Sequence, residues 1–458
     1  MHYIRLLRPP SLVEGKQTVL SFVLTITTDL GDSFYSPDGP RGISVRLETE
    51  TRLNEPAVAA SSDGSSPSDS ATNQYSDVMP PSRKRKRAGS EELSGSGEAV
   101  ETTAARTEEH FFQIDCPAKQ ASSGKTQSLA WSSGTRVLKM GLVVPQEAVA
   151  RLRDPLVVRR RICFSMLDRR LSIVSATDVI TTGSYSVVPL WVDVPATDSE
   201  AFRHVAVRRL CIGHDDRQPE KRPIWVEEEE EVGESIARHI WDAGLATVAF
   251  VADTCMGSSR GRTEEEQDGL AGYLRRLLAT KPGRLHVLEL GSGVGILGIG
   301  LATILGHVRR GGPDEQDEQD GISVLLTDLP EAEERATANM QRATVPAQVR
   351  LDYENLDWDE GCQGRFGAKV AGGRPWDLVV LSDCTYNVDM LPALVQTLSA
   401  LQAAASTGVR VLLARKPRHA DEEALFGLLA GEGWQLSASS TMALPGGKEE
   451  LELYLYGR

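Results

Sequence analysis

Apolar and polar residues alternate in two different ways along this chain. In its second half, short apolar runs typical of buried strands, such as 285–290 and 376–383, are separated by segments with apolar residues at helical spacing, such as 294–305. Strands that alternate with helices predict a mostly parallel sheet covered on both faces. The last two strand-like runs, 434–440 and 450–456, have no helix between them, so we expect an antiparallel hairpin at one edge of the sheet.

The first half shows the period-two pattern of half-buried strands, which predicts a β-rich domain over residues 1–55 and 108–210. Between these parts, residues 56–107 are rich in Ser, Gly, Asp and Glu and poor in aromatic residues. Such a segment cannot bury enough apolar surface to offset its ordering entropy, so we interpret it as a disordered insertion. The strand–helix pattern over 222–458 predicts a separate α/β domain.

Five consecutive basic residues, 83–87, lie inside this insertion. They favour a nuclear import signal or a nucleic-acid patch, and a solvated charge run without a receptor is the alternative. The six cysteines form no C-x-x-C pair, which favours reduced thiols in the cytosol or nucleus over a disulfide scaffold or a zinc module. We therefore expect a protein of the nucleus, the cytoplasm or both, with no metal site.

The overall charge bears on partners. A formal net charge of −14 disfavours direct binding to nucleic acid and permits a basic partner. Five glutamates at 227–231 could attract such a partner, or could simply stabilise the N-terminus of the helix predicted after them. The sequence has no apolar run long enough for a membrane span, and its first residues lack the apolar core of a signal peptide. We expect a monomer that does not bind membranes.

A glycine-rich turn follows the predicted strand at 285–290. GVGILG at 293–298 fits the G-x-G-x-x-G of a dinucleotide site, but the strand runs directly into Gly291, so the relevant register begins there. Glu289 would repel a pyrophosphate, and it suits a ligand with positive charge, such as the amino group and sulfonium of S-adenosylmethionine. Glycines permit close approach of the ligand to the backbone. The candidate loop consists of Gly291, Ser292, Gly293, Val294 and Gly295.

Further candidates follow the next strands, because ligands bind at the carboxyl ends of strands in open α/β sheets. Asp328 and Leu329, at the end of the second strand, are candidate cofactor-binding residues. Asp328 can accept hydrogen bonds from both ribose hydroxyls, which fits NAD as well as S-adenosylmethionine. Asp357 and Trp358 follow the third strand, where they could hold an adenine. A buried loop aromatic is the alternative for Trp358. Ser382 lies at the end of the fourth strand.

Asp383 and Tyr386 follow this fourth strand, in SDCTYN. Together, VLELGSGVGILGIGLA, TDLP and SDCTY resemble family 16 of the class I methyltransferases, the non-histone protein-lysine methyltransferases, whose signature here is D-x-x-Y. The resemblance covers about 222–458. It implies a seven-stranded Rossmann-like sheet, S-adenosylmethionine as cofactor, and Trp241 as a residue of the cofactor pocket. The run TDLGDSF at 28–34 is similar to the branch of this family with an extended N-terminus and nuclear members.

The resemblance also implies attack of a neutral lysine amine of a protein substrate on the methyl group. A free lysine has a pKa near ~10.4, so only about one in a thousand is neutral near pH 7.4. A carboxylate beside the amine would stabilise its charged form. We therefore expect Asp383 to bind and orient the lysine, and Tyr386 to shape its channel. The structural alternatives are that Asp383 caps the following helix and that Tyr386 packs in the core.

Two other functions remain open from the sequence. One is methylation of an amine in nucleic acid or in a small molecule. Enzymes that act on bases usually have an Asn/Asp-Pro-Pro-aromatic segment after the fourth strand, whereas DCTY contains no proline. The other is a catalytically silent module that binds S-adenosylmethionine and a partner. The intact glycines, Glu289 and Asp328 count against it, because a silent site need not keep them.

Overall fold

The computed structural model describes most of the predicted α/β and β-rich regions. The described residues are 1–52, 107–115, 129–181, 186–195, 202–213, 222–229, 235–257, 269–309, 321–372, 376–403, 408–446 and 449–458. The predicted insertion over 56–107, apart from its last residue, and the basic run at 83–87 lie outside these ranges. The expectations of disorder and of nuclear import therefore stay predictions.

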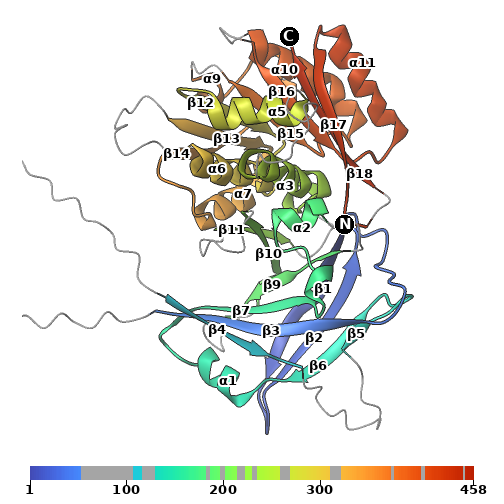
Figure 1. Ribbon diagram of the computed structural model, residues 1–458, viewed down its shortest axis with the longest axis vertical. Helices are drawn as coiled ribbons and strands as arrows, with labels where there is room; N and C mark the ends of the chain where they lie inside the picture. Colours follow the sequence, from blue (N-terminus) through green and yellow to red (C-terminus); the bar gives the residue numbers. More distant parts are fainter. Residues whose placement is uncertain are drawn as a thin grey trace, which may run out of the picture.

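A seven-stranded sheet forms the centre of the C-terminal domain (Figure 1). In spatial order its strands are β14 (Val349–Asn355), β13 (Ile322–Asp328), β12 (Leu285–Leu290), β15 (Leu378–Ser382), β16 (Arg410–Arg415), β18 (Glu450–Gly457) and β17 (Gln435–Ala443). The first five are parallel neighbours, whereas β18 runs antiparallel to both β16 and β17. The predicted parallel α/β sheet and its terminal hairpin are both confirmed.

Helices cover both faces of this sheet. They are α3 (Asp242–Met256), α5 (Leu270–Arg275) with the π-helical turn η3 (Arg276–Thr280), α6 (Ile296–Val308), α7 (Pro330–Arg342), α8 (Trp358–Gly361), α9 (Ala368–Ala371), α10 (Leu391–Ala403), η5 (Ala420–Glu423) and α11 (Ala424–Gly431). Successive residues of a strand point to opposite faces. Val287 of β12 therefore shares a core with α3 and α6, and Leu288 shares another with α10 and α11. The predicted helix around Trp241 begins later than expected, at Asp242.

Two sheets that pack face to face form the N-terminal domain (Figure 1). One contains β6 (Leu138–Val143), β2 (Val19–Thr27), β1 (His2–Val13) and β8 (Val187–Val188). The other contains β11 (Arg222–Glu229), β10 (Val205–Ile212), β9 (Leu190–Asp193), β7 (Val157–Met166), β3 (Arg41–Arg52) and β4 (Thr107–Gln113), with β5 (Ala130–Trp131) paired to β3. Phe22 and Phe164 meet edge to face between the sheets, with ring centroids 5.0 Å apart.

Two local features of this domain were not predicted. β1 contains Pro9 and Pro10, residues that argue against a regular strand, and its pairing with β2 is irregular between Arg8 and Ser11. The strand pattern also did not predict the short helices α1 (Gln146–Leu152) and α2 (Ala176–Thr181).

Strands β3 and β4 are antiparallel neighbours in which Arg52 lies opposite Thr107. The chain therefore leaves this sheet and re-enters it at the same point.

Strand β11 corrects both interpretations of the glutamate run, as far as the described Glu227, Glu228 and Glu229 are concerned. These residues belong to a strand that pairs with β10, and they neither precede a helix directly nor form an open acidic patch. Glu227 is buried and its carboxylate pairs with Arg335 at 2.7 Å. Glu228 is also buried and pairs with Arg208 at 2.7 Å. Buried carboxylates that already have guanidinium partners cannot attract a basic substrate segment.

The same strand joins the N-terminal sheet to the C-terminal domain. The Asn339 side chain on α7 accepts a hydrogen bond from the backbone N–H of Glu227 at 2.8 Å and donates to the Glu227 carbonyl at 3.0 Å. Its amide also donates to the carbonyl of Val294, inside the glycine loop, at 2.8 Å. The boundary predicted at residue 222 therefore falls at the start of a strand that contacts both domains.

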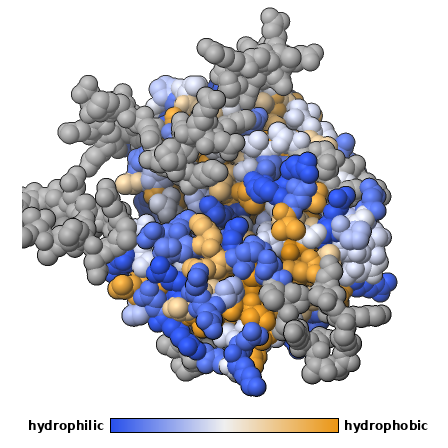
Figure 2. All heavy atoms as spheres, turned by 60° about the horizontal axis from the view of Figure 1, so that its bottom comes forward, coloured by the Kyte–Doolittle hydropathy of each residue, from blue (hydrophilic) through white to orange (hydrophobic). Residues whose placement is uncertain are grey.

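Figure 2 views the molecule from the end formed by the N-terminal domain, where hydrophobic and hydrophilic side chains are interspersed. Exposed apolar residues in this domain belong to different elements, including Leu7 of β1, Val137 before β6 and Val158 of β7. Within the described ranges, no helix combines the length and the apolar character that a bilayer crossing requires.

Candidate active site

The glycine loop connects β12 to α6 in a backbone conformation that other residues rarely adopt. Gly291, Gly293 and Gly295 have φ angles of 68°, 53° and 84°, in the left-handed region. A Cβ atom on Gly291 would lie 2.5 Å from the Sγ atom of Cys384, which is far inside van der Waals contact. The register that begins at Gly291 thus matches the conformation of the loop.

Asp328 joins the end of β13 to this loop. Its carboxylate accepts hydrogen bonds from the N–H groups of Gly293 and Leu329, both at 2.7 Å. Burial raises the pKa of Asp328, although these two donors act in the opposite direction. Each carboxylate oxygen can accept more than one hydrogen bond, so Asp328 keeps the capacity to bind hydroxyl groups of a ligand. Leu329 is exposed beside it.

Glu289 lies behind the loop. Its side chain is buried between β12 and α6, where Oε2 accepts a hydrogen bond from the Gly298 N–H at 2.9 Å. Burial raises the pKa of Glu289 well above its usual range. A carboxylate in this place ties the strand to the first turn of the helix, a role that the sequence did not indicate. Its direct contact with a positively charged ligand stays a prediction.

Ser292 provides a test of whether the loop suits a ligand. Ser292 is buried, and its backbone N–H donates a hydrogen bond to the carbonyl of Thr327 at 3.0 Å. Among the described residues its hydroxyl oxygen has no hydrogen-bond partner, although the atom itself is buried. A buried polar atom without a partner is unfavourable, and a bound polar ligand would satisfy it. The orphaned hydroxyl and the glycine backbone therefore fit a cofactor at this loop.

Trp358 and Asp357 reach the same loop from the other side. Asp357 caps α8 by accepting a hydrogen bond from the Asp359 N–H at 2.9 Å. Trp358 then lies half-buried, with its Cζ2 atom 3.4 Å from the position that a Cβ of Gly291 would take. The structure thus brings the predicted adenine-contacting pair next to the glycine loop.

A segment that sequence patterns placed in a helix crosses the loop instead. The 3₁₀ turn η2 (Ile236–Arg238) brings the Ala237 carbonyl oxygen to 3.1 Å from the Cβ position of Gly293. Arg238 fastens it by donating to the carbonyl of Glu331 at 3.1 Å. Trp241, at the start of α3, donates from its indole to the Ile236 carbonyl, also at 3.1 Å. Trp241 therefore belongs to a cover over the loop.

Asp383 is fixed by contacts within the protein. Among the residues that the structure describes, Asp383 is the one non-glycine residue with a positive φ angle, 51°, and its side chain is buried. Its carboxylate accepts hydrogen bonds from the N–H groups of Ala243 and Lys416, both at 3.0 Å, and lies 3.3 Å from the Arg418 guanidinium. Burial raises the pKa of Asp383 to about 6, although Arg418 and both N–H groups lower it. The carboxylate caps α3, which precedes it in the chain, and not the following helix.

Ser382 and Tyr386 flank this buried carboxylate. Ser382 ends β15, and its Oγ atom is 3.4 Å from the Cβ position of Gly244 on α3. Tyr386 is half-exposed at the rim, so the core alternative does not apply to it. Burial of the ring raises the pKa of Tyr386, and the charge of Asp328 raises it further. The phenol is thus protonated at neutral pH.

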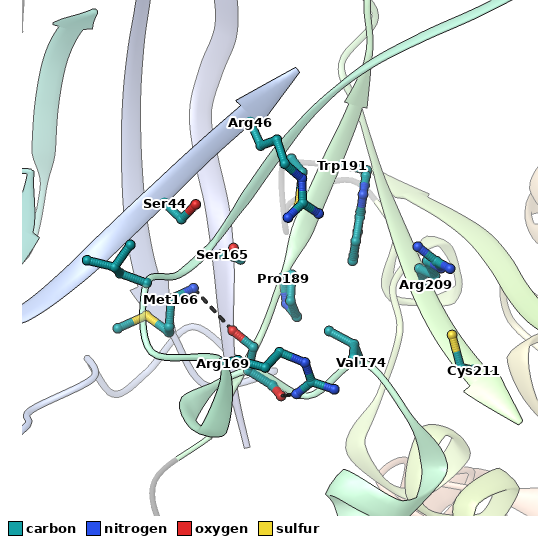
Figure 3. A pocket seen from close by; sticks show the side chains of 13 residues that line it. Ser44, Arg46, Ser165, Met166, Arg169, Val174, Pro189, Trp191, Arg209 and Cys211 are labelled. Carbon is teal, nitrogen blue, oxygen red and sulfur yellow. Dashed lines mark hydrogen bonds between the residues drawn. The ribbon is translucent and has the colours of Figure 1, made fainter. Parts of the chain in front are cut away.

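A separate pocket of about 300 Å³ lies on the N-terminal domain, on the face of its larger sheet that turns away from the shared core (Figure 3). The guanidinium groups of Arg46 and Arg209 lie on either side of the Trp191 indole (Figure 3). None of the glycine-loop or D-x-x-Y residues lines this pocket, so it does not belong to the candidate active site.

Comparisons with known proteins agree with this geometry. Residues 220–432 match the family model described as lysine methyltransferase. A UPF0665 family protein of Schizosaccharomyces pombe is 25% identical over 262 residues, which cover 56% of this chain and 64% of that protein. The chain therefore spans less than two thirds of the length of this curated relative.

Similar solved structures are methyltransferases of low sequence identity. Magnesium protoporphyrin IX methyltransferase from Synechocystis shares 17% identity, covering 44% of this chain and 86% of that chain, with a TM-score of 0.27. A putative RNA methyltransferase from Pyrococcus horikoshii shares 10% identity, covering 50% and 90%, with a TM-score of 0.29. The family match and the site on this sheet lead to one conclusion: residues 220–432 are similar to the lysine methyltransferase family and form a methyltransferase domain that uses S-adenosylmethionine.

Proposed function

We propose that this protein transfers methyl groups from S-adenosylmethionine to a lysine side chain of another protein. The observation that carries the proposal is the D-x-x-Y segment: Asp383 is buried at the carboxyl end of β15, and Tyr386 is half-exposed three residues later. The family description, lysine methyltransferase, supports the same acceptor. A half-exposed aromatic side chain beside this strand end can line the path of a long, thin acceptor such as lysine.

The cofactor supplies a methyl group on a positively charged sulfur, and the acceptor amine must be neutral to attack it. A free carboxylate at the rim would hold the amine in its charged form. Here the Asp383 carboxylate is already engaged by two N–H groups and by Arg418, so it presents little free negative charge. The protonated Tyr386 phenol can accept a hydrogen bond from the amine without adding a charge. Alignment of the two reactants would then provide most of the acceleration.

The buried position gives Asp383 the role of a positioning residue. Asp383 is the first residue of the D-x-x-Y turn and has a left-handed backbone conformation, which Asp tolerates better than most residues. The contacts of its carboxylate hold the turn in this conformation. Tyr386 is then the residue of the pair that faces the substrate. This assignment replaces the expected direct contact between the Asp383 carboxylate and the lysine amine, because the side chain is buried and its charge already faces Arg418 as well as two N–H groups.

Labelled S-adenosylmethionine tests the acceptor. The full chain is incubated with a cell extract and methyl-labelled cofactor, and labelled protein is hydrolysed to amino acids. We expect the label in methylated lysine, reduced in Tyr386→Phe, which lacks the hydroxyl, and reduced further in Tyr386→Ala, which also lacks the ring. Label in nucleic acid, in small molecules or in another amino acid would refute the lysine acceptor. Complete absence of label with cofactor bound would favour the silent-module alternative.

Asp328→Ala should weaken cofactor binding while leaving the sheet folded. The variant loses an acceptor for ribose hydroxyls and the hydrogen bond that holds the Gly293 N–H. Hydrogen bonds to a charged group contribute about 1.5–3 kcal/mol, so we expect the Kd for S-adenosylmethionine to rise roughly 10- to 100-fold in titration calorimetry. Asp352→Ala, on the neighbouring β14, is the control and should bind normally. Equal affinity of the two variants would remove Asp328 from the binding site.

A further inference from the structure

The TDLGDSF run, whose purpose the sequence did not reveal, forms the turn that follows β2. Its Asp29 carboxylate is fully buried, although it belongs to the N-terminal domain. Oδ1 lies 2.7 Å from the Lys416 ammonium, and Oδ2 lies 2.8 Å from the Arg418 guanidinium. Both cations follow β16 of the methyltransferase sheet. One carboxylate of the N-terminal domain thus holds two cations of the other domain.

These cations also hold the D-x-x-Y segment. Arg418 lies between two carboxylates, at 2.8 Å from Asp29 and 3.3 Å from Asp383. Lys416 donates its backbone N–H to Asp383 at 3.0 Å, while its ammonium contacts Asp29 and, at 2.9 Å, Asp242. Asp29 and Asp383 are therefore separated by a single guanidinium. A change in the charge of either carboxylate therefore alters the electrostatic environment of the other.

The N-terminus of α3 makes the arrangement more specific. Trp241, at the N-cap position, has a side chain that makes no capping hydrogen bond to this helix. Instead, Asp29 accepts from the Asp242 N–H at 3.2 Å, and Asp383 accepts from the Ala243 N–H at 3.0 Å. Two carboxylates from two domains thus cap neighbouring N–H groups of one helix end, where the helix dipole favours negative charge.

We propose that Asp29 is a positioning residue of the methyltransferase site, which holds Arg418, Lys416 and the start of α3 so that the D-x-x-Y turn keeps its reactive geometry. The N-terminal domain is then part of the catalytic apparatus. The proposal rests on the proposed function for its effect on turnover. Arg418 also lies over the Trp241 ring, with its guanidinium carbon 5.3 Å from the ring centroid. Arg418 therefore contacts both the Asp383 carboxylate of the turn and the Trp241 ring.

The charges in this network set the sign of the expected pH effect. Burial alone would raise the pKa of Asp29, but the hydrogen bond from Arg418 and the charge of Lys416 hold it well below its usual range, so Asp29 stays ionised. Its negative charge contributes to the raised pKa of Asp383. Among the described residues, Arg418, Asp29 and the Cys384 thiol act on Asp383 directly, and the same network contains Lys416, Asp242, Glu449, His2, Tyr3 and the amino group of Met1.

Asp29→Asn tests the proposal in the full chain, with Asp32→Asn as the matched control. Asp32 is exposed in the same turn and accepts a hydrogen bond from the nearby Thr28 hydroxyl. Asp29→Asn removes a negative charge near Asp383 and frees Arg418 to pair with it. We therefore expect the Asp383 pKa, followed by carbon-13 NMR of the carboxyl and assigned with Asp383→Asn, to fall by about one pH unit. The acid limb of the turnover profile should move down with it.

We also expect Asp29→Asn to reduce kcat about tenfold or more, with the Kd for S-adenosylmethionine little changed. Asp32→Asn should leave all three quantities at wild-type values. An Asp383 pKa and kcat in Asp29→Asn that equal those of Asp32→Asn would overturn the proposal. A wild-type protein without methyl transfer would refute the proposed function alone, since the NMR titration still decides the positioning role.

If Asp29→Asn does not fold, Arg418→Lys tests the same link between Asp29 and Asp383. Lysine keeps the positive charge but replaces the planar guanidinium, whose Nη2 atom contacts both carboxylates, with a compact ammonium on a flexible stem. We expect kcat to fall in this variant with cofactor affinity retained. Unchanged kcat would show that the link between Asp29 and Asp383 does not position the turn, and the proposal would then be wrong.

Discussion

Gly291→Ala is expected to abolish measurable binding of S-adenosylmethionine. The new Cβ would lie 2.5 Å from the Cys384 Sγ and 3.4 Å from Trp358 Cζ2. Cys384 is buried and its thiol donates to the Leu290 carbonyl at 3.3 Å, so it has little room to move away. The loop must therefore shift, and the positions of its N–H groups shift with it. Titration calorimetry on the purified variant is the direct measurement.

Gly364→Ala separates this clash from the cost of the backbone conformation. Gly364 has φ 72°, close to the 68° of Gly291, but nothing lies within 4 Å of its Cβ position. Both variants incur roughly 1–2 kcal/mol for a left-handed alanine. We expect Gly364→Ala to lose that much stability and to bind the cofactor normally. Matching affinities in the two variants would refute a close approach of the cofactor to the glycine loop.

Asp383→Ala is expected to destabilise the fold and to stop methyl transfer. It leaves the buried N–H groups of Ala243 and Lys416 without their acceptor and places alanine at a φ of 51°. Arg418 keeps Asp29 as a partner, so the loss should come mainly from the two N–H groups, about 2–4 kcal/mol in all. Denaturant unfolding at pH 8, well above the Asp383 pKa of about 6, measures this loss.

Asp389→Ala provides the control, because Asp389 is exposed a short distance further along the same loop. It should unfold like the wild type. If Asp383→Ala also unfolds like the wild type but transfers no methyl group, then its carboxylate acts on the substrate directly. That result would restore the amine-binding role that the sequence favoured.

The methyltransferase sheet could be predicted because its signals are local. Each buried strand is a short apolar run, and the glycine register follows from where one strand ends. The positive φ angles of Gly291, Gly293 and Gly295 agree with that register. Trp358, which follows the third strand in the chain, also lies next to the loop. Such features depend on residues that are neighbours in the chain.

The remaining parts of the site depend on partners that lie far apart in the chain. No period or motif indicates that Asp29 pairs with Arg418, 389 residues away, or that Asp383 caps a helix that begins 141 residues earlier. The interpretation of the glutamate run failed for the same reason, since the Arg335 and Arg208 partners of the buried β11 glutamates come from other elements. The charge of a residue is visible in a sequence, but the identity of its partner is not.

The pairing of Arg52 with Thr107 has a practical consequence for work on this protein. The two strand ends that carry residues 53–106 are opposite each other in one antiparallel pair, at the edge of a sheet in the N-terminal domain. Doubling the length of a flexible connection between two such fixed points costs only about 0.6 kcal/mol. Related proteins can therefore differ greatly in length here without altering the strand pairing. A reporter domain whose own termini lie close together could be spliced in at the same point.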